Sequence, residues 1–295
     1  MRVAVVGATG LIGGRLVERL TELGMFPVPV SRSGGLVRGV PCVTWDAASG
    51  PPPEAMLDGT DAIVNLAGVS IGEGRWTEAR KRAILDSRLA TTGALVQAIA
   101  DGGPRVLVNA SAVGVYGTGE RECDESTPPG DDFLARTCVQ WEEAARAAST
   151  HGARVVLLRS GIVLAARGGA LAKQLPLFRL GLGGPLGGGR QWQSWIHLDD
   201  EVDLIVHALR RTDLVGPLNL TAPTPVRQRE FAATLGRVLG RPAVLPTPGI
   251  ALRLALGEMS TLALDGQRVV PRRAQDTGFA FRFTDLEPAL RDLLG

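Results

Sequence analysis

The chain has 295 residues, of which 45% are hydrophobic and 21% charged, and its formal net charge at pH 7 is +2. A chain of this length buries a sizeable core without a metal or disulfide staple, and so small a net charge gives no electrostatic reason to expect nucleic acid as a partner. The three cysteines, Cys42, Cys123 and Cys138, are widely spaced and form no CxxC pair, which argues against a disulfide framework or a metal site.

No stretch of the chain predicts a membrane span or an export signal. No apolar run approaches the ~20 residues of a membrane span. The first predicted strand begins at residue 2, which leaves no room for a signal peptide. We therefore expect a cytoplasmic protein, a monomer or a homodimer, whose partner is a small molecule rather than nucleic acid or a membrane.

Strand and helix patterns alternate along most of the chain. Short apolar runs predict strands at residues 2–6, 26–30, 40–45, 61–66, 105–110, 154–159 and 217–220. Apolar residues at helical spacing predict helices at residues 11–23, 77–100, 131–149, 199–210 and 227–239. This alternation predicts an α/β fold, a Rossmann-like parallel sheet with helices on both faces.

The alternation breaks after Leu164. Residues 181–189 contain six glycines, too many for a packed element, and the chain beyond residue 240 is rich in Leu, Arg and Pro and predicts a small helical cap. We therefore expect two domains. The division is residues 1–164, joined again by 195–222, for the cofactor domain, and residues 165–194 with 223–295 for a small C-terminal substrate domain.

A glycine triplet follows the first predicted strand. Gly7, Gly10 and Gly13 have a GxxGxxG spacing directly between strand and helix. Gly7 permits a tight turn, Gly10 lets the backbone approach a pyrophosphate, and Gly13 allows the helix to pack closely on the strand. The helix N-terminus adds N–H groups and a positive dipole. The triplet therefore predicts a dinucleotide-binding turn.

The end of the second strand selects the cofactor. An acidic residue there would accept hydrogen bonds from the adenosine ribose and repel a 2′-phosphate, but the sequence has Ser31, Arg32 and Ser33. The Arg32 guanidinium can stack on adenine or pair with the phosphate, and the flanking hydroxyls can donate to it. The sequence thus favours NADP(H) over NAD(H); the alternative is an arginine exposed in a loop.

Four further positions could complete the cofactor site. Asp46 follows the third strand and could reach the adenine edge or cap a turn. Ala67 and Gly68 follow the fourth strand, where their small side chains leave room for the ribose and diphosphate. Arg88, in the next helix, is either a cofactor contact or a surface charge, and its spacing does not decide between them.

Two sets of long motifs are distributed along nearly the whole chain. The first set is GATGLIG at 7–13, NLAG at 65–68, NASAVGVYG at 109–117 and WIHLDD at 195–200. This set resembles the extended short-chain dehydrogenase/reductase superfamily of nucleotide-sugar epimerases and dehydratases. The second set is LRSGIVL at 158–164, GGPLGGGRQWQSWIHLDD at 183–200, LALGEMSTLALDGQRVVP at 254–271 and TGFAFRF at 277–283. The second set is more similar to an atypical branch of the NAD-dependent epimerase/dehydratase family, sometimes labelled cell-division-inhibitor homologues.

This resemblance implies a Rossmann-like cofactor domain, a small C-terminal substrate module and NADP(H) in the cleft between them. It implies cofactor contacts from Gly7, Thr9, Gly10, Leu11, Ile12, Ser31, Arg32, Leu66, Ala67 and Arg88.

The resemblance also reveals that the usual proton-transfer pair is missing. In the superfamily, hydride chemistry relies on a Ser, a Tyr and a Lys four residues after that Tyr, which lowers the phenol pKa from its unperturbed ~10. Ser111, just past the fifth strand, is the candidate for the Ser. Aligning the next helix by Glu142 places Leu134 where the Tyr belongs and Cys138 where the Lys belongs, and no Tyr or Lys lies nearby.

Three substitutes for the missing pair remain. Tyr116, the only tyrosine, lies on the expected floor of the active site and forms the candidate catalytic pair with Ser111; the alternative is a packing tyrosine that bonds nearby backbone. Cys138 could act as a thiol acid–base or be a small buried residue. Asp131 and Asp132 could supply a carboxylate base or cap the helix.

The segment after the glycine-rich loop carries the candidate substrate contacts. Arg190, Gln191, Trp192 and Trp195 offer donors for a phosphate or carboxylate and an aromatic face for a ring. The alternative is that they form a folded cover over the loop. For His197, close to two aspartates, a structural role at the domain junction is favoured over a catalytic one.

Two functions from different classes follow. The first is an NADP(H)-dependent oxidoreductase or epimerase acting on a sugar nucleotide or a similar polar alcohol or ketone. The second is a non-catalytic NADP(H)-binding sensor or regulatory protein, which the missing Tyr–Lys pair favours. A direct interaction with the division machinery has no support in any sequence feature.

Overall fold

A seven-stranded parallel sheet forms the centre of the molecule in the computed structural model, which describes residues 1–295. The strand order is β13-β9-β7-β6-β1-β2-β5, and every neighbouring pair is parallel. In chain order the strands are β1 (Arg2–Val6), β2 (Phe26–Ser31), β5 (Val43–Thr44), β6 (Ala62–Asn65), β7 (Val106–Ala112), β9 (Arg154–Ser160) and β13 (Gly216–Leu220).

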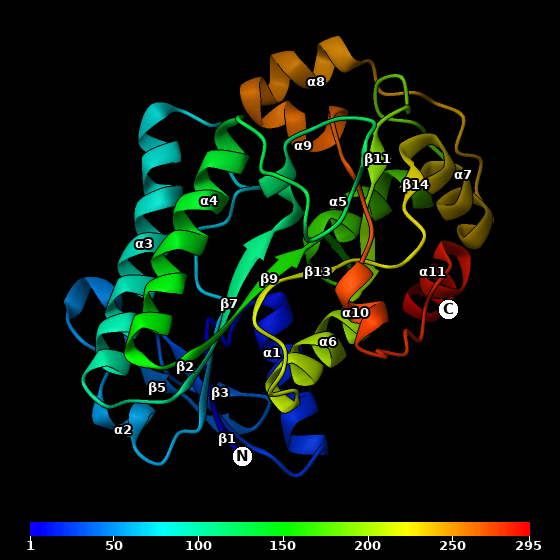
Figure 1. Cartoon of the computed structure of the whole chain (residues 1–295). Coiled ribbons are helices and arrows are strands. Elements are labelled where there is room, and N and C mark those ends of the chain that lie inside the picture. The colour runs from blue at the N-terminus through cyan, green and yellow to red at the C-terminus, as the bar shows by residue number, and fades with distance from the viewer.

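Helices cover both faces of this sheet (Figure 1). One face is covered by α1 (Leu11–Glu22) and α6 (Leu198–Arg210), and the other by α3 (Glu78–Ala100) and α4 (Phe133–Arg146). Alternate residues of β1 serve the two layers: Val3 and Val5 pack with α1 and α6, while Ala4 and Val6 pack on the opposite side. This arrangement confirms the predicted α/β fold with a Rossmann-like sheet.

The chain reverses its direction across the sheet at β1. From β1 it moves outward to β2 and β5, and it then returns to β6 on the opposite side of β1. Ligand sites in open α/β sheets lie at such a reversal, outside the carboxyl ends of the strands. Gly7 follows β1 with a φ of +83°, and a Cβ there would lie 3.0 Å from the Leu66 carbonyl, so this turn requires glycine.

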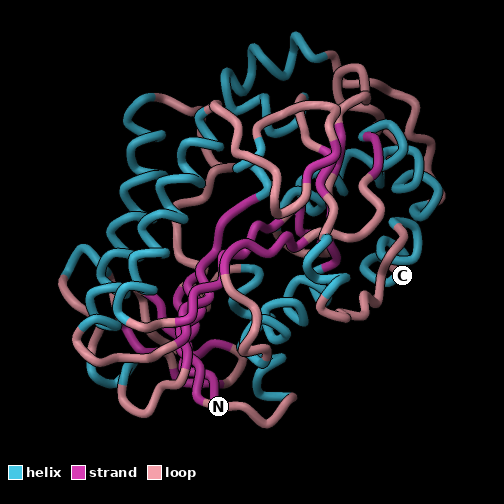
Figure 2. The backbone as a smooth tube through the Cα atoms, in the orientation of Figure 1, coloured by secondary structure: helices cyan, strands magenta, loops and turns pink.

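The remaining elements form a smaller part beside the carboxyl ends of the sheet strands, where Figure 2 shows mostly loops and short helices. Its strand pairs are β10 (Ile162–Leu164) with β12 (Trp195–His197), β11 (Trp192–Gln193) with β14 (Val226–Arg227), and β15 (Arg268–Val269) with β8 (Glu122–Cys123). Its helices are α5 (Gly169–Arg179), α7 (Gln228–Leu239), α8 (Gly249–Leu256), α9 (Thr261–Leu264), α10 (Arg272–Asp276) and α11 (Leu286–Leu294). A separate apolar core joins α5, α7 and α11 around Trp195.

Most element boundaries shift by one or two residues from the sequence predictions, as in β7, which extends to Ala112, and two elements differ more. The expected strand at 40–45 is instead a hairpin of β3 (Leu36–Val37) and β4 (Val40–Pro41), followed by the short edge strand β5. A continuous strand is disfavoured there because proline has no N–H to donate to a ladder. The expected helix at 131–149 begins after an Asp132 cap and ends in a 3₁₀ turn.

Helix length bears on membrane association. No helix of the chain combines the length and the apolar composition that crossing a membrane requires.

The short helix α2 (Glu54–Leu57) completes the set of α-helices, and it lies in the connection between β5 and β6.

Candidate active site

A groove of about 440 Å³ lies outside the carboxyl ends of β1, β2 and β6. The sequence-predicted cofactor residues that line it are Gly7, Thr9, Gly10, Ser31, Arg32, Asp46, Leu66, Ala67 and Gly68. The groove is also lined by Trp45, Ser87 and Thr91, which the sequence interpretation missed. The predicted residues Leu11, Ile12, Gly13, Ser33 and Arg88 are not among its lining residues.

The N-terminus of α1 opens into this groove. Gly10 is the N-cap residue, no side chain caps the helix, and no acidic residue lies in its first turn. The first N–H groups of an α-helix have no partner within the helix, so those of the turn that contains Leu11 and Ile12 are available to an anion. A Cβ on Gly13 would lie 2.3 Å from the Gly7 carbonyl oxygen, so Gly13 acts by allowing the helix to approach the turn.

Arg32 extends from the end of β2 at the rim of the groove. Its side chain is exposed and forms no ion pair within the chain, and Ser33 beside it is also exposed. Asp46 lines the groove and at the same time caps a 3₁₀ turn, because its carboxylate accepts a hydrogen bond from the Ala48 N–H. Both sequence alternatives for Asp46 are therefore compatible with its position.

Arg88 lies behind the groove wall rather than facing the groove. Its Nη1 donates to the carbonyl oxygens of Val69 at 3.1 Å and Ile84 at 2.8 Å, and its guanidinium carbon lies 4.9 Å from the centre of the Trp141 ring. Burial lowers the pKa of this guanidinium. Arg88 thus supports the loop after β6, and its cofactor contact stays a prediction.

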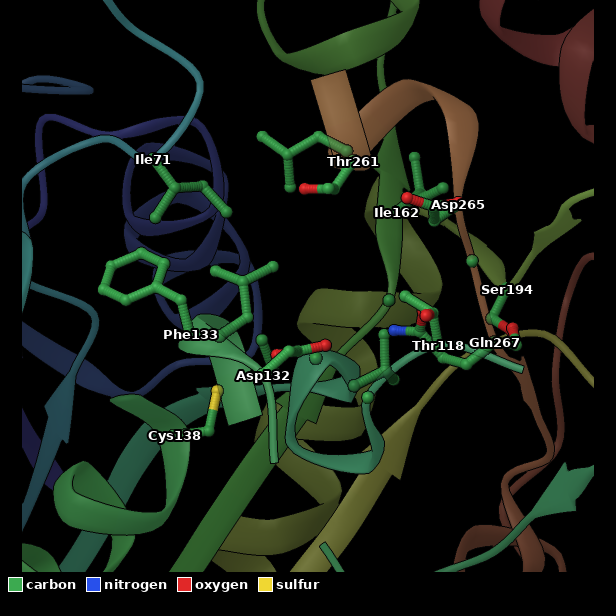
Figure 3. A pocket seen from close by; sticks show the side chains of 18 of the residues that line it. Ile71, Thr118, Asp132, Phe133, Cys138, Ile162, Ser194, Thr261, Asp265 and Gln267 are labelled. Carbon is green, nitrogen blue, oxygen red and sulfur yellow. The ribbon is translucent and has the colours of Figure 1, made fainter. Parts of the chain in front are cut away.

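A second cavity of about 300 Å³ lies at the carboxyl ends of β7 and β9, on the same edge of the sheet as the groove (Figure 3). Its polar side chains come from segments far apart in sequence: Thr118, Asp132, Cys138, Ser160, Trp192, Ser194, Glu258, Thr261, Asp265 and Gln267. Its apolar walls include Ile71, Trp76, Phe133, Leu134 and Ile162. In Figure 3, Asp132, Phe133 and Cys138 lie on one side of the cavity, and Thr261 and Asp265 lie on the other.

The first turns of α4 supply the wall where the proton-transfer pair was expected. Leu134 and Cys138 both line the cavity, and neither carries a hydroxyl or an amine. Burial, together with the nearby Glu142 carboxylate, raises the pKa of the Cys138 thiol to about 11, so the thiol stays neutral at neutral pH. Asp132 also lines the cavity, but its Oδ1 accepts the Ala135 N–H at 2.8 Å as the helix cap.

The prediction that Ser111 faces the site is wrong. Successive side chains of a strand point to opposite faces, and the one that lines the cavity is Ala112. The Ser111 hydroxyl is directed the other way, where it donates to Glu142 Oε1 at 2.8 Å. Ser111 therefore contributes to the packing of α4 on the sheet, and it is not among the residues that line the cavity.

Tyr116 does not lie on the cavity floor, where the sequence predicted it. The ring is only 7% exposed and does not line the cavity. Its hydroxyl donates to Asn219 Oδ1 at 2.7 Å and accepts from Arg159 Nη1 at 2.9 Å. Burial raises the pKa of this phenol to about 12, even though the Arg159 charge opposes the shift. A phenol with these partners is a structural group, the alternative that the sequence left open.

A buried ion pair explains why these two hydroxyls turn inward. Arg159 donates to both carboxylate oxygens of Glu142, at 2.8 and 2.9 Å, and both side chains are almost fully buried. Ser111 and Tyr116 fill hydrogen-bonding positions around this pair. The sequence interpretation missed the pair because its members lie in a helix and a strand whose contact depends on the tertiary fold.

The expected substrate residues separate into three environments. Trp192 lines the cavity, its Nε1 donates to Glu120 Oε2 at 3.0 Å, and the Arg227 guanidinium lies 3.8 Å from its ring centre. Arg190 and Gln191 line a neighbouring pocket that Trp192 shares. Trp195 is 0% exposed, so its prediction as a substrate contact is wrong. Its indole fills the core between α5 and α7 because this three-residue strand is completely covered.

His197 lies at the junction between the two parts of the molecule. Its Nδ1 accepts the N–H of Asp199 as the cap of α6, and its Nε2 lies 3.2 Å from Asp292 Oδ2. The ring packs against Phe283 with 4.1 Å between centres. These contacts give His197 the structural role that the sequence favoured.

Ser160 and Glu201 form a contact that the sequence interpretation missed. Ser160 lines the cavity, and its hydroxyl donates to Glu201 Oε1 at 2.6 Å. Glu201 is 0% exposed, although it carries a carboxyl group. The sequence does contain one sign that Glu201 is buried. It lies one turn before Ile205 in the apolar stripe of an amphipathic helix, where a solvated charge is not expected.

Comparison with known proteins adds a family context to this geometry. The profile of the NAD dependent epimerase/dehydratase family matches residues 3–220, and that of a domain of unknown function (DUF1731) matches residues 247–293. The chain is 43% identical to an epimerase family protein of Mycobacterium bovis, covering 98% of this chain and 96% of that protein. It is 40% identical to epimerase family protein SDR39U1 of Homo sapiens over 100% of both.

A solved structure is similar over nearly the whole chain. The crystal structure of human epimerase family protein SDR39U1 (isoform 2) with NADPH has a TM-score of 0.89 and 39% sequence identity, and the match covers 99% of each chain. These matches confirm the family resemblance that the motifs predicted, including the C-terminal module.

Proposed function

We propose that this chain, which belongs to the NAD dependent epimerase/dehydratase family, is an NADP(H)-dependent oxidoreductase or epimerase. Its substrate is a sugar nucleotide or a similar polar alcohol or ketone. One observation carries the proposal: a groove suited to a dinucleotide and a cavity suited to a small polar ligand both lie at the carboxyl edge of one parallel sheet, at neighbouring strands. The NADPH in the human relative supports the choice of cofactor.

The residues present in the groove fit NADP(H). The uncapped first turn of α1 offers N–H groups to a pyrophosphate. Gly10 lines the groove, and a side chain there would crowd the turn, since its Cβ would lie 3.3 Å from the Gly7 carbonyl oxygen. The unpaired Arg32 beside Ser31 and Ser33 suits a 2′-phosphate. When bound, the nicotinamide would supply or accept a hydride.

We also propose the division into domains that the sequence suggests, with the substrate between them. Residues 1–164 and 195–222 would hold the cofactor, and residues 165–194 and 223–295 would cover the substrate. The cavity lining supports this division, because Ala112 comes from the first part and Asp265 from the second.

The size of the cavity bears on the substrate. A volume of about 300 Å³ lies at the lower end of the usual ~300–1,000 Å³ for small-molecule sites. It suits a single ring or a small ketone. Trp192 connects it to a neighbouring pocket that contains Arg190 and Gln191, where a charged extension of the same ligand would find a cation and an amide.

A turnover assay tests the proposal. The protein is loaded with NADPH and incubated with a panel of nucleotide sugars and small ketones, and the absorbance of the reduced nicotinamide and the stereochemistry of the products are followed. We expect turnover of at least one panel member. NADPH binding at micromolar affinity or better with no turnover across the panel contradicts the proposal.

The second candidate is a non-catalytic NADP(H)-binding sensor or regulatory protein. It is favoured by one observation, that Leu134 and Cys138 occupy the wall where the superfamily carries its acid–base pair. The same assay separates the two candidates. A sensor would bind NADPH and NADP⁺ with different affinities, which calorimetry measures, and would oxidise neither the cofactor nor any panel member.

A further inference from the structure

We propose that Ser160 and Glu201 form a proton relay that serves the cavity, with Ser160 as the catalytic residue that touches the substrate oxygen and Glu201 as the group behind it that stores the proton. This inference rests on the proposed oxidoreductase function and deepens it. It assigns the proton transfer that the expected Tyr–Lys pair cannot perform in this chain.

Ser160 has the position that a proton donor to the cavity requires. It is the last residue of β9, and in the sheet it pairs with Ala112 of β7 on one side and Leu220 of β13 on the other. Ala112 and Ser160 both line the cavity, so a ligand held against the end of β7 lies next to a hydroxyl supplied by β9. The expected serine on β7 points away, and the neighbouring strand provides one instead.

Glu201 is a buried carboxyl group without a charged partner. Its Oε1 accepts the Ser160 hydroxyl at 2.6 Å, and its Oε2 is buried with no hydrogen-bond partner. A buried, unpaired carboxylate is very costly, so such a group stays protonated. A neutral carboxyl has a proton to give, and Ser160 is the only polar group that it contacts.

The charged groups around Glu201 are all paired with other residues. The arginines on the elements packed against Glu201 have other partners. Arg154 donates to backbone carbonyl oxygens. The other four form ion pairs, which are Arg15–Asp199, Arg19–Asp203, Arg159–Glu142 and Arg282–Asp203. On its own helix and β12, His197 faces Asp292, and Asp200 accepts the N–H groups of Arg282 and Phe283. Burial therefore dominates, and it raises the pKa of Glu201 to about 8.

The proton and electron balance of a reduction is complete with these groups. The carbonyl carbon of a ketone accepts a hydride from the reduced nicotinamide, which becomes oxidised. The Ser160 hydroxyl, which donates to Glu201 Oε1 in this structure, turns to the substrate, and the carbonyl oxygen takes its proton as the C=O π bond becomes a C–O single bond. Ser160 Oγ then takes the proton of the Glu201 carboxyl group. The products are an alcohol, the oxidised cofactor and the Glu201 carboxylate, which then regains a proton. Oxidation of an alcohol follows the same steps in reverse. A proton store with a pKa near the working pH suits both directions.

Infrared spectroscopy tests the relay without any substrate. The C=O band of a protonated carboxyl, isolated as wild type minus Glu201→Gln, should be present at pH 7 and disappear with a midpoint near pH 8. On transfer to D₂O this band should shift rapidly as the proton exchanges. Ser160→Ala should lose the fast exchange, because the hydroxyl is the route to the cavity.

Thr221→Val is the matched control, since it removes a buried hydroxyl beside the same strand ends that contacts Val269 and not Glu201. It should leave both the band and its exchange unchanged. Ionised Glu201 at pH 7, or exchange in Ser160→Ala as fast as in wild type, overturns the relay.

Turnover distinguishes failure of the relay from failure of the proposed function. For any panel ketone that is reduced, Glu201→Gln and Ser160→Ala should each lower kcat by about 10²-fold while NADPH affinity is retained, which also shows that the variants fold. In wild type kcat should fall above pH 8, and Glu201→Gln should remove that fall. Unchanged kcat in both variants overturns the relay and leaves the function intact. If no panel member reacts, the proposed function fails and the infrared result decides the relay.

Discussion

The cofactor groove and the second cavity are built in different ways along the same edge of one sheet. The groove depends on backbone: a turn that only Gly7 can make, free N–H groups at the start of α1 and small residues after β6. The cavity depends on side chains brought together from α4, the ends of β7 and β9 and the segment after α8. The groove therefore depends on glycine positions and free N–H groups, whereas the cavity depends on which side chains the tertiary fold brings together.

The largest effect is expected beneath the cavity. Arg159→Leu leaves the buried Glu142 carboxylate with only the half-exposed Arg146 as an ionic partner, and removing one partner of a buried ion pair costs about 3–5 kcal/mol. Urea unfolding should show this loss. Arg146→Ala is the control, since it removes the half-exposed partner of the same carboxylate, and such pairs contribute about 0–1 kcal/mol. Equal losses of unfolding free energy in the two variants would show that the buried Arg159–Glu142 pair contributes no more than the exposed one.

The next effect is a pH dependence of stability. The pKa of Glu201 is higher in the folded chain than its ordinary value of 4.5, at about 8, so the folded state holds the proton more tightly than the unfolded state. Its contribution is fully present below pH 4.5 and is lost as the pH rises towards 8. The stability of wild type relative to Glu201→Gln should fall by about 1.4 kcal/mol per pH unit across that window and then level off. A constant difference from pH 5 to 9 in urea titrations contradicts this assignment.

On the groove side, Gly13→Ala tests the backbone. The added Cβ would lie 2.3 Å from the Gly7 carbonyl oxygen, so the helix must move away from the turn, at a cost of about 1–3 kcal/mol and with loss of NADPH affinity. Gly93→Ala in α3 is the matched control because nothing lies within 4 Å of its Cβ position; it should stabilise by about 0.5–1 kcal/mol. Unchanged NADPH binding in Gly13→Ala would show that NADPH affinity does not depend on the close approach of α1 to the glycine turn.

Arg32 is the charged side chain on which the preference for NADP(H) over NAD(H) depends. Arg32→Asp should weaken NADPH binding about 10- to 100-fold, the loss of roughly one charge-assisted phosphate contact of 1.5–3 kcal/mol, and should leave NADH binding almost unchanged. Fluorescence titration of both cofactors measures the ratio. Equal losses for NADPH and NADH would refute the preference for the phosphorylated cofactor.

The sequence predicts the groove better than the cavity. The fold and the groove follow from local patterns, since strand, glycine turn and helix are consecutive, and Gly7, Gly10 and Gly13 act through backbone geometry that adjacent residues determine. The cavity could not be predicted in this way. Ser111 and Ala112 differ by one position, and only the strand orientation decides which of them faces the ligand.

The same limit applied to the buried polar groups. Leu134 and Cys138, which replace the Tyr–Lys pair in the sequence prediction, line the cavity. No spacing rule connects Ser160 with Glu201, 41 positions apart in the chain. Their contact arises because α6 packs against the sheet beside β9. A carboxyl group on the apolar stripe of a helix was the only local signal.

The smallest effect concerns Tyr116, and it decides whether the cavity has been assigned correctly. Tyr116→Phe removes a hydroxyl that bonds Asn219 and Arg159, so it should cost about 1 kcal/mol of stability, the net value of an ordinary hydrogen bond. Because the phenol does not line the cavity, turnover of any panel substrate should be unchanged. A loss of about 10²-fold in kcat, the size of a general acid–base contribution, with the stability of the variant retained would mean that the phenol turns towards the ligand during the reaction. In that case Tyr116, rather than Ser160, would be the group that exchanges the proton with the substrate.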